Sequence, residues 1–266
     1  MKVLLIPVTY NSYADLHSYL RDVNVATANT DKVEVRVSIV DNSVQLEVQT
    51  FDEYKFIDVE MHHFNNLGYL RGAGAIINSE ENIEQYDYVI ISNVDLSIPE
   101  DFFVKFSNLN FQEEKVGWLA NRIWTKAEKR DKNPKILRRY SKKKLQMIRL
   151  LYKYPILDWL YTNTMYRRKS GYKECFEQNI YAGHGSFIIL TKEFFKNSSK
   201  IEYPVFLFGE EIFLAEICQR KNLKVRYIPD LVIYDNEHTS TGKMKRKFYY
   251  KCNLEAINYL LHTFYE

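Results

Sequence analysis

The sequence predicts an α/β fold with a mostly parallel sheet flanked by helices. Segments rich in β-branched residues alternate with segments of helical periodicity over the first half of the chain, as βαβ units require. The first such segment, residues 3–8, is apolar throughout, which is typical of a parallel strand buried on both faces. Its 266 residues suffice for one large core, and we assign 1–266 to a single domain.

The remaining elements follow from local patterns. Leu16 and Leu20 stand at helical spacing, whereas the next segment alternates and ends in a polar turn. The expected strands cover residues 3–8, 33–40, 57–64, 86–92, 186–190 and 224–228. The expected helices cover residues 14–23, 71–83, 210–221 and 244–261. Residues 123–173 break the alternation, and we interpret them as a basic, aromatic-rich helical insertion within the domain.

Polar side chains follow four of the expected strands. Thr9 and Asn11 come after the first, Asp41 after the second, Asn66 after the third and Asn93-Val94-Asp95 after the fourth. In open α/β sheets, ligands bind beyond the carboxyl ends of the strands. Loops are commonly polar, but four such clusters at one edge of a sheet predict a ligand site.

At this point the sequence resembles the inverting glycosyltransferases of family 2, especially bacterial rhamnosyltransferase-like and polysaccharide-building members. The resemblance covers nearly the whole chain except the basic middle, and it implies the GT-A fold. Each motif is weak alone, but their order along the chain is that of the family. The matching motifs are Val8-Thr9-Tyr10-Asn11, Val40-Asp41-Asn42-Ser43, Asn66-Leu67-Gly68-Tyr69, Ile91-Ser92-Asn93-Val94-Asp95, Gly185-Ser186-Phe187, Phe208-Gly209-Glu210-Glu211 and His238.

The resemblance implies a metal-binding motif at Asn93-Val94-Asp95, with Asp95 as a ligand and His238 completing the site. Mg²⁺ or Mn²⁺ suits carboxylate and phosphate oxygens, and it neutralises the charge of a diphosphate leaving group. Asn93 replaces the first Asp of the usual motif, so one carboxylate is missing. A plain Asn-x-Asp turn before the helix near Pro99 is the structural alternative.

The same resemblance makes Glu211 the catalytic base, at a position where the family more often has Asp. A carboxylate there would take the proton of the acceptor hydroxyl as it attacks the anomeric carbon. Direct displacement with a single base implies inversion. Glu210 and His184 are assigned to acceptor contacts. Alternatively, both glutamates merely favour a helix N-terminus, where negative charge is stabilised.

The nucleotide contacts implied by the resemblance involve the strand exits and the loop after the third strand. UDP- and dTDP-sugars both fit as donors. The donor-binding residues are Thr9, Asn11, Asp41, Asn66, Arg71, Asn93 and Asp95.

Charge is distributed unevenly along the chain. The net charge is +3, yet residues 122–173 carry 17 Lys and Arg against three acidic residues. Cations interleaved with Tyr and Trp over residues 135–173 favour a membrane surface or a lipid-linked acceptor. A solvated face or an oligomer contact fits the same pattern. Nucleic acid is disfavoured because no recognised nucleic-acid module accompanies the segment.

The three cysteines lack metal-site spacing, and no segment reaches the roughly 18 apolar residues that span a bilayer. We therefore expect a cytoplasmic protein, peripheral on the inner face of the cell membrane. The predicted function is transfer of a sugar to a lipid-linked or saccharide acceptor during synthesis of a cell-surface polysaccharide such as a capsule. The alternatives are a sugar-1-phosphate nucleotidyltransferase and a catalytically inactive nucleotide-sugar-binding or membrane-adaptor protein.

Overall fold

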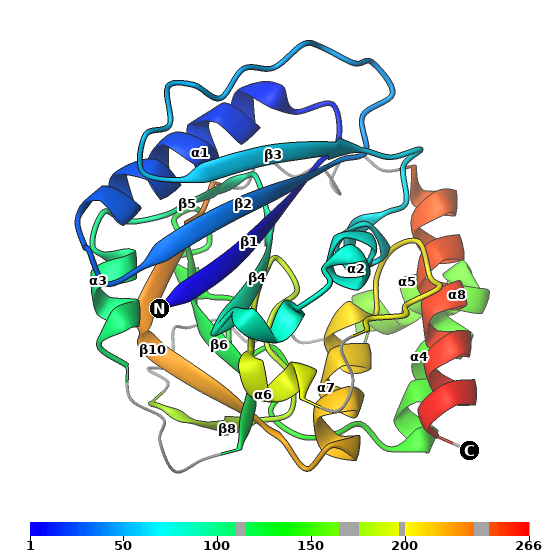
Figure 1. The fold of residues 1–266 in the computed structure, drawn as a ribbon. Helices are drawn as coiled ribbons and strands as arrows, with labels where there is room; N and C mark the ends of the chain where they lie inside the picture. The colour runs from blue at the N-terminus through cyan, green and yellow to red at the C-terminus, as the bar shows by residue number, and fades with distance from the viewer. Residues whose placement is uncertain (110–114, 165–175, 197–199, 237–244, 266) are drawn as a thin grey trace.

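The computed structural model describes residues 1–109, 115–164, 176–196, 200–236 and 245–265, and it contains one ten-stranded mixed sheet (Figure 1). The strands are β1 (Lys2–Thr9), β2 (Glu34–Asp41), β3 (Asp58–His63), β4 (Tyr88–Asn93), β5 (Leu96–Ser97), β6 (Val116–Thr125), β7 (Arg130–Asp131), β8 (Gln178–Ile180), β9 (Phe187–Thr191) and β10 (Lys224–Asp235). The helices are α1 (Tyr13–Ala28), α2 (Tyr69–Ser79), α3 (Phe102–Ser107), α4 (Lys142–Lys153), α5 (Pro155–Thr164), α6 (Lys192–Phe195), α7 (Glu210–Arg220) and α8 (Arg246–Phe264), with a 3-10 turn at Ile83–Gln85.

The sheet has the order β3-β2-β1-β4-β9-β6-β10-β5. Strands β1 to β4 pair in parallel, and β6 pairs in parallel with β10. Strand β9 lies between β4 and β6 and runs antiparallel to both. The sequence prediction of a mostly parallel α/β sheet flanked by helices is confirmed.

Both faces of the sheet are buried. Along β1, Leu4 and Ile6 join one apolar cluster, and Val3 and Leu5 join the other. Helices α1 and α3 cover one face, and α2, α6 and α7 cover the other. Each fully buried aliphatic side chain contributes about 1.5–3 kcal/mol to the free energy of folding. The continuous apolar run of β1 therefore suits an interior strand, and β1 lies between β2 and β4.

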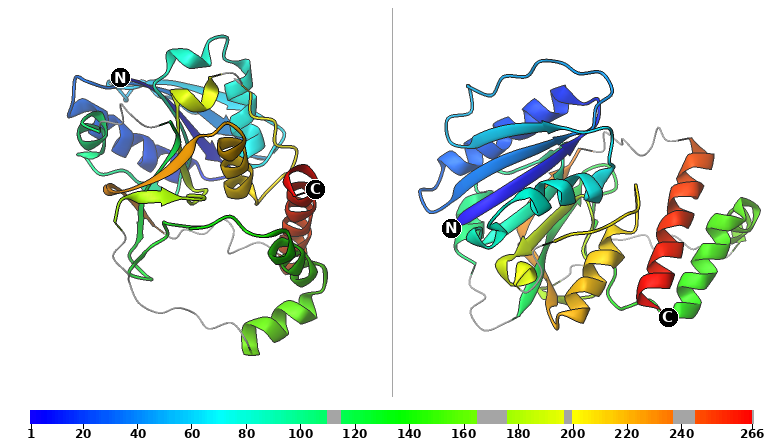
Figure 2. Two further views of the ribbon diagram at one scale, coloured as in Figure 1. Left: turned by 90° about the horizontal axis from the view of Figure 1, so that it is seen from below. Right: turned by 45° about the vertical axis from the view of Figure 1, so that its right-hand side comes forward.

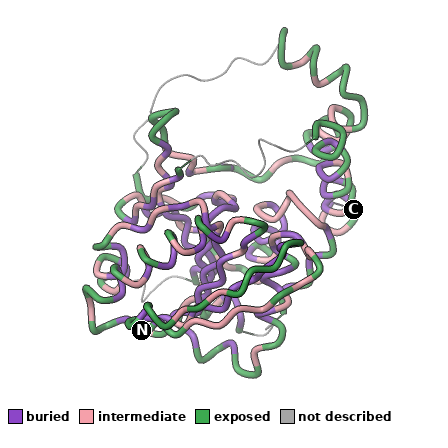
Figure 3. Tube along the Cα trace, turned by 90° about the horizontal axis from the view of Figure 1, so that it is seen from above, coloured by how far each residue is buried: buried purple, intermediate pink, exposed green. Residues whose placement is uncertain are grey.

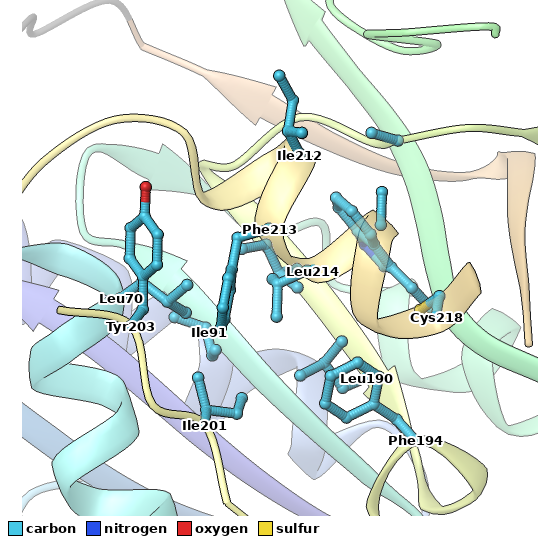
Figure 4. Packing of buried hydrophobic residues seen from close by; sticks show 14 of the residues in the cluster. Leu70, Ile91, Leu190, Phe194, Ile201, Tyr203, Ile212, Phe213, Leu214 and Cys218 are labelled. Atoms are coloured by element: carbon cyan, nitrogen blue, oxygen red, sulfur yellow. The ribbon is translucent and has the colours of Figure 1, made fainter. Parts of the chain in front are cut away.

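Helix α7 is held against the sheet by its own apolar face. Figure 4 shows Phe213 and Leu214 of α7 packed beside Ile91 of β4 and Leu190 of β9. Phe213 also lies 4.6 Å, ring centroid to centroid, from Tyr203. This packing fixes the start of α7, and hence Glu210 and Glu211, relative to the carboxyl end of β4.

The helices of the basic middle begin later than the sequence predicts. Residues 116–125 form β6, 130–131 form β7, and Ile136 bridges to Ala182, so among the described residues of this segment helix is confined to α4 and α5. Ile123 and Thr125, two residues apart, are both fully buried, which fits the alternation of a strand. Pairing with β10 makes this segment a strand. Among the described residues, no helix is both long and apolar enough to cross a bilayer.

Strand β10 continues to Asp235, although the sequence pattern predicts an end at residue 228. A register shift between Ile228 and Val232 interrupts its pairing with β6. Pro229 falls within that shift, because proline has no N–H to donate to a ladder. The second part of β10 then carries Asp235 to the edge of the sheet where the strand exits gather.

Candidate functional site

The parallel register brings the first two strand exits together. Thr9 of β1 stands beside Asp41 of β2, and Val8 stands beside Asn93 of β4. The Asn42 amide donates to the Thr9 carbonyl over 3.0 Å. The predicted residues Thr9, Asp41 and Asn93 therefore lie at one edge of the sheet.

Asp41 is buried in a fixed hydrogen-bond network. Its carboxylate accepts from the Tyr13 hydroxyl at 2.9 Å and from the Ser43 amide at 2.9 Å, and His63 Nδ1 lies 3.6 Å away. Asn11, in the left-handed region at φ 51°, accepts from the Val44 amide through its Oδ1 over 3.0 Å. Both residues thus shape the loops after β1 and β2.

The hydroxyl of Thr9 differs from these groups. It is buried, and it has no hydrogen-bond partner among the described residues. A buried hydroxyl without a partner costs about 1–3 kcal/mol. Thr9 therefore has hydrogen-bonding capacity left for a ligand at the carboxyl end of β1.

The loop between β3 and α2 approaches another backbone closely at Gly68. Gly68 has φ 85°, and a Cβ built there would lie 1.9 Å from the Phe206 carbonyl oxygen. Asn66 also has positive φ, at 43°, which Asn tolerates better than most residues. Arg71 follows in the first turn of α2, where it is exposed. The loop thus presents Asn66 and Arg71 from a rigid base.

Asp95 lies beside a second carboxylate that the sequence analysis missed. Antiparallel pairing places Leu96 of β5 opposite Asp235 of β10, and the Asn236 amide donates to the Asp95 carbonyl over 3.2 Å. Burial, followed by the negative charge of Asp235, raises the pKa of Asp95 to about 6. The two carboxylates form an acidic pair at the edge of the sheet.

Lys132 partly neutralises this pair. Its Nζ lies 2.5 Å from Asp235 Oδ2, and its charge also lowers the pKa of Asp95. Within the described ranges, no group of three or more His, Cys, Asp or Glu side chains is arranged to hold a metal ion. His238, the other predicted metal ligand, lies outside the described residues.

Glu210 and Glu211 begin α7 directly against Gly185. A Cβ at Gly185 would lie 3.0 Å from Glu210 Oε1 and 3.3 Å from Glu211 Cδ. Gly209, with φ 82°, precedes the pair in the left-handed conformation. Burial, followed by the negative charge of Glu211, raises the pKa of Glu210 to about 8. At neutral pH, Glu210 is therefore largely protonated.

His184 precedes Gly185, the residue that lies against this pair. Its Nδ1 accepts from the Ser186 amide at 3.2 Å and lies 3.0 Å from Ser186 Oγ. Burial, helped by the nearby cations Lys135 and Lys132, holds the pKa of His184 well below its usual range. The imidazole is consequently neutral at physiological pH, with Nδ1 as an acceptor.

The hydroxyl of Tyr69 relates the two groups of carboxylates to each other. It is buried and unpartnered among the described residues. Burial raises its pKa well above the usual value, and the charges of Glu210, Asp95 and Glu211 raise it further. In addition, the Asn93 amide donates to the Ser186 carbonyl over 2.9 Å, which joins β4 to the chain beside Gly185. The end of β4, which precedes Asp95, therefore adjoins the start of α7 with Glu210 and Glu211.

The chain is similar to known proteins in its fold but not in its sequence. No protein-family profile and no curated protein matches this sequence. Solved structures match in fold. Residues 1–349 of TarS from S. aureus, in complex with UDP-GlcNAc, align with a TM-score of 0.55 at 14% identity, over 95% of this chain and 64% of that chain. The fold is of the GT-A type.

Two other glycosyltransferase structures show the same arrangement. GalNAc-T7 with UDP, GalNAc and Mn²⁺ aligns at a TM-score of 0.58 and 10% identity, over 97% of this chain and 47% of that one. The mannosyltransferase PcManGT from Pyrobaculum calidifontis, with GDP-Man and Mn²⁺, aligns at a TM-score of 0.50 and 13% identity. The alignment covers 98% of this chain and 70% of that one. The present chain spans 64% of the length of the TarS fragment.

Proposed function

We propose that this chain is a nucleotide-sugar-dependent glycosyltransferase of family 2. The observation that carries the proposal is the contact of Glu210 and Glu211 with Gly185, one residue before Ser186. The Ser186 carbonyl accepts from the Asn93 amide at the end of β4, so the start of α7 lies beside the carboxyl end of a strand in a GT-A-type sheet. A strand-exit carboxylate near a pair of helix-start glutamates provides both functions that sugar transfer needs. The strand-exit carboxylate would hold a divalent cation that stabilises the diphosphate leaving group, and one glutamate would deprotonate the acceptor.

The donor's nucleotide is proposed to bind along the exits of β1, β2 and β3. The free hydrogen-bonding capacity of Thr9, the buried carboxylate of Asp41 and the exposed guanidinium of Arg71 suit a base, a ribose and a diphosphate respectively. Asn11 and Asn66 would keep the two loops in their left-handed turns. UDP- and dTDP-sugars both remain candidates, and TarS was solved with UDP-GlcNAc.

The acidic pair of Asp95 and Asp235 fits Mg²⁺ or Mn²⁺ by its chemistry, since both ions prefer carboxylate and phosphate oxygens. Two protein carboxylates leave room for diphosphate oxygens, with His238 as a further candidate ligand. A bound ion would neutralise charge on the diphosphate leaving group. Lys132 would hold Asp235 in place and add positive charge beside the pair.

The proposed base is Glu211, with Glu210 as its protonated neighbour. Burial, followed by the negative charge of Glu211, raises the pKa of Glu210 and favours its protonated form. Glu211 would accept the proton of the acceptor hydroxyl, and a single base acting in a direct displacement gives inversion. Neutral His184 and protonated Glu210 can both contact acceptor hydroxyls. A lipid-linked or saccharide acceptor, in cytoplasmic synthesis of a surface polysaccharide, completes the proposal.

A thermal-shift screen with UDP-, dTDP- and GDP-sugars, each with and without Mn²⁺, tests donor and metal together. Specific binding raises the melting temperature by mass action. We expect a Mn²⁺-dependent shift with one nucleotide class, lost in Asp95→Asn and in Asp235→Asn but kept in the exposed control Asp230→Asn. The absence of a shift with every donor would contradict the proposal.

Glu211→Gln separates an enzyme from an inactive binding protein. We expect it to keep the donor-induced shift while donor turnover falls by about 10²–10⁴-fold, the usual contribution of a general base. Glu255→Gln, at an exposed glutamate of α8, serves as the matched control and should retain wild-type turnover. Donor binding without turnover in the wild-type protein would instead support the inactive nucleotide-sugar-binding alternative.

A further inference from the structure

The helices α4, α5 and α8 form a layer on the outside of the molecule, away from the sheet (Figure 2). Helix α5 has no buried residue, and α4 buries only Leu145. In Figure 3, most of the protruding helical segment is exposed. Ile156 is 70% exposed and Trp159 is 55% exposed. Helix α5 therefore carries large apolar side chains that the fold itself does not bury.

These side chains border a groove of about 690 Å³ between α5 and α8. One wall comes from the end of α4 and from α5, and the other comes from the first half of α8. Ile156 and Trp159 are three residues apart on one wall, and Lys247, Lys251 and Leu254 follow helical spacing on the other. Two amphipathic helix faces thus open to the same side.

The charge of this layer is strongly positive. Helices α4, α5 and α8 carry eight Lys and Arg residues but only two acidic ones, Asp158 and Glu255. Asp158 accepts a hydrogen bond from the Tyr250 hydroxyl inside the groove. Lys153 and Lys247 border the groove and are exposed. The cations therefore surround an apolar centre that has little negative charge to neutralise them.

We propose that this basic groove face, formed by α4, α5 and the first half of α8, docks on the surface of an anionic lipid bilayer. Apolar side chains such as Ile156 and Trp159 would enter the boundary between headgroups and acyl chains, while Lys153 and Lys247 would contact lipid phosphates. Basic amphipathic helices with exposed Trp and Leu bind membranes in this way. The proposal concerns docking alone and does not depend on catalytic activity.

Two other occupants fit this face less well. A second copy of the chain would place one basic face against another, and like charges repel across an interface. A nucleic acid would neutralise the lysines, but it would leave aliphatic side chains such as Ile156 and Leu157 without an apolar partner. Of these three, a lipid surface satisfies the cations and the aliphatic side chains together.

The groove face also adjoins the proposed catalytic end of the sheet. The Tyr152 ring, which lines the groove, lies 6.1 Å from the Tyr249 ring, and Tyr249 lies 5.2 Å from Phe208, just before α7. Burial is the main cause that raises the pKa of Tyr152, Tyr249 and Asp158 follow, and the charge of Glu211 adds a smaller contribution. A bilayer bound at the groove would therefore lie on the side of the molecule where Glu211 is found.

Co-sedimentation of the full chain with vesicles tests the proposal directly. The vesicles are pure phosphatidylcholine, or phosphatidylcholine with about 30 mol% phosphatidylglycerol, at about 0.1 M salt. We expect binding to the anionic vesicles only. Each lysine near an anionic surface contributes about fivefold in partitioning, so Lys153→Gln/Lys247→Gln should weaken binding about 25-fold. Ile156→Ala/Trp159→Ala should weaken it by at least about tenfold.

Matched variants outside the groove control for the loss of positive charge and of apolar surface. Lys55→Gln/Lys200→Gln and Phe56→Ala remove exposed side chains of the same kinds outside the groove, and they should bind vesicles like the wild type. Equal binding by groove and control variants would overturn the proposal, as would failure of the wild type to bind anionic vesicles. The wild type could instead fail to bind vesicles but dimerise with concentration or bind RNA. If the Ile156→Ala/Trp159→Ala variant lost that dimerisation or RNA binding, the face would belong to another partner.

Discussion

The strand-exit region and the basic groove face differ in how far their key side chains are buried and held by neighbouring residues. At the strand exits, Asp41 is buried and both of its oxygens accept hydrogen bonds from the protein. On the groove face, Ile156 and Trp159 project into solvent. The first region depends on fixed positions, because a buried carboxylate needs every partner. The second depends on composition, since binding to a fluid lipid surface requires only positive charge and exposed apolar area.

This difference predicts where the chain tolerates change. A substitution at the strand exits meets backbone and buried side chains that have nowhere to move. A substitution on the groove face meets solvent, so it changes what the surface binds and leaves the fold intact. Three stability measurements test whether the two regions differ in this way.

The largest effect is expected for Gly68→Ala. Positive φ costs a residue with a side chain about 1–2 kcal/mol, and the new Cβ would lie 1.9 Å from the Phe206 carbonyl oxygen. Together with overpacking, we expect a loss of at least about 3 kcal/mol in the free energy of unfolding, measured by urea denaturation. In the matched variant Gly72→Ala the nearest atoms belong to the side chains of Val40, at 2.7 Å, and Asn42, at 3.5 Å, so the loss should be smaller. Equal losses would show that the close approach of the two backbones is not decisive.

Per unit of pH, a smaller effect is expected from the titration of Glu210. Its folded-state pKa of about 8 lies above the ordinary value of 4.5, so the native state holds a proton that the unfolded chain releases. Stability is therefore greatest below pH 4.5 for this group, and it falls as the pH rises towards 8, by up to about 1.4 kcal/mol per pH unit.

Thermal melts between pH 5 and pH 8 measure this dependence. Glu210→Gln should flatten the fall in melting temperature, while the exposed control Glu255→Gln should keep the wild-type slope. The same slope in all three proteins would mean that Glu210 ionises normally in the folded protein.

The smallest effect is expected on the groove face. Ile156→Ala/Trp159→Ala should change the free energy of unfolding by less than about 1 kcal/mol, because α5 has no buried residue. Urea denaturation measures the change. A loss comparable to that of Gly68→Ala would mean that α5 contributes to the core, and the contrast between the two regions would not hold.

Much of the fold was predictable because its signals are local. The apolar run of β1, the alternation of β2 and the polar residues that end each strand are visible within a few residues. The placement of Thr9, Asp41 and Asn93 at one edge followed from parallel strands alone. The catalytic, donor and metal roles assigned to these and the other site residues stay predictions.

What the sequence did not reveal depends on pairing between distant segments. Asp235 was missed because Pro229 and the register shift conceal the continuation of β10, and only its pairing with β5 brings it to Asp95. Lys132 was missed because the basic middle was interpreted as helical, whereas pairing with β10 makes its first part a strand. The acidic residue shortly before His238, at the end of an alternating run, was the available signal for Asp235.

The position of β9 has a consequence for how the protein is made. Strands β1 to β4 lie within the first 93 residues, but β4 receives its second neighbour only from residues 187–191. While the ribosome synthesises the intervening chain, the emerging parallel half exposes the unpaired edge of β4 in addition to the outer edge of β3, and such edges are prone to pairing with other chains. Nascent chains stalled between residues 93 and 187 should therefore depend most on chaperones, and release of β9 should end that dependence.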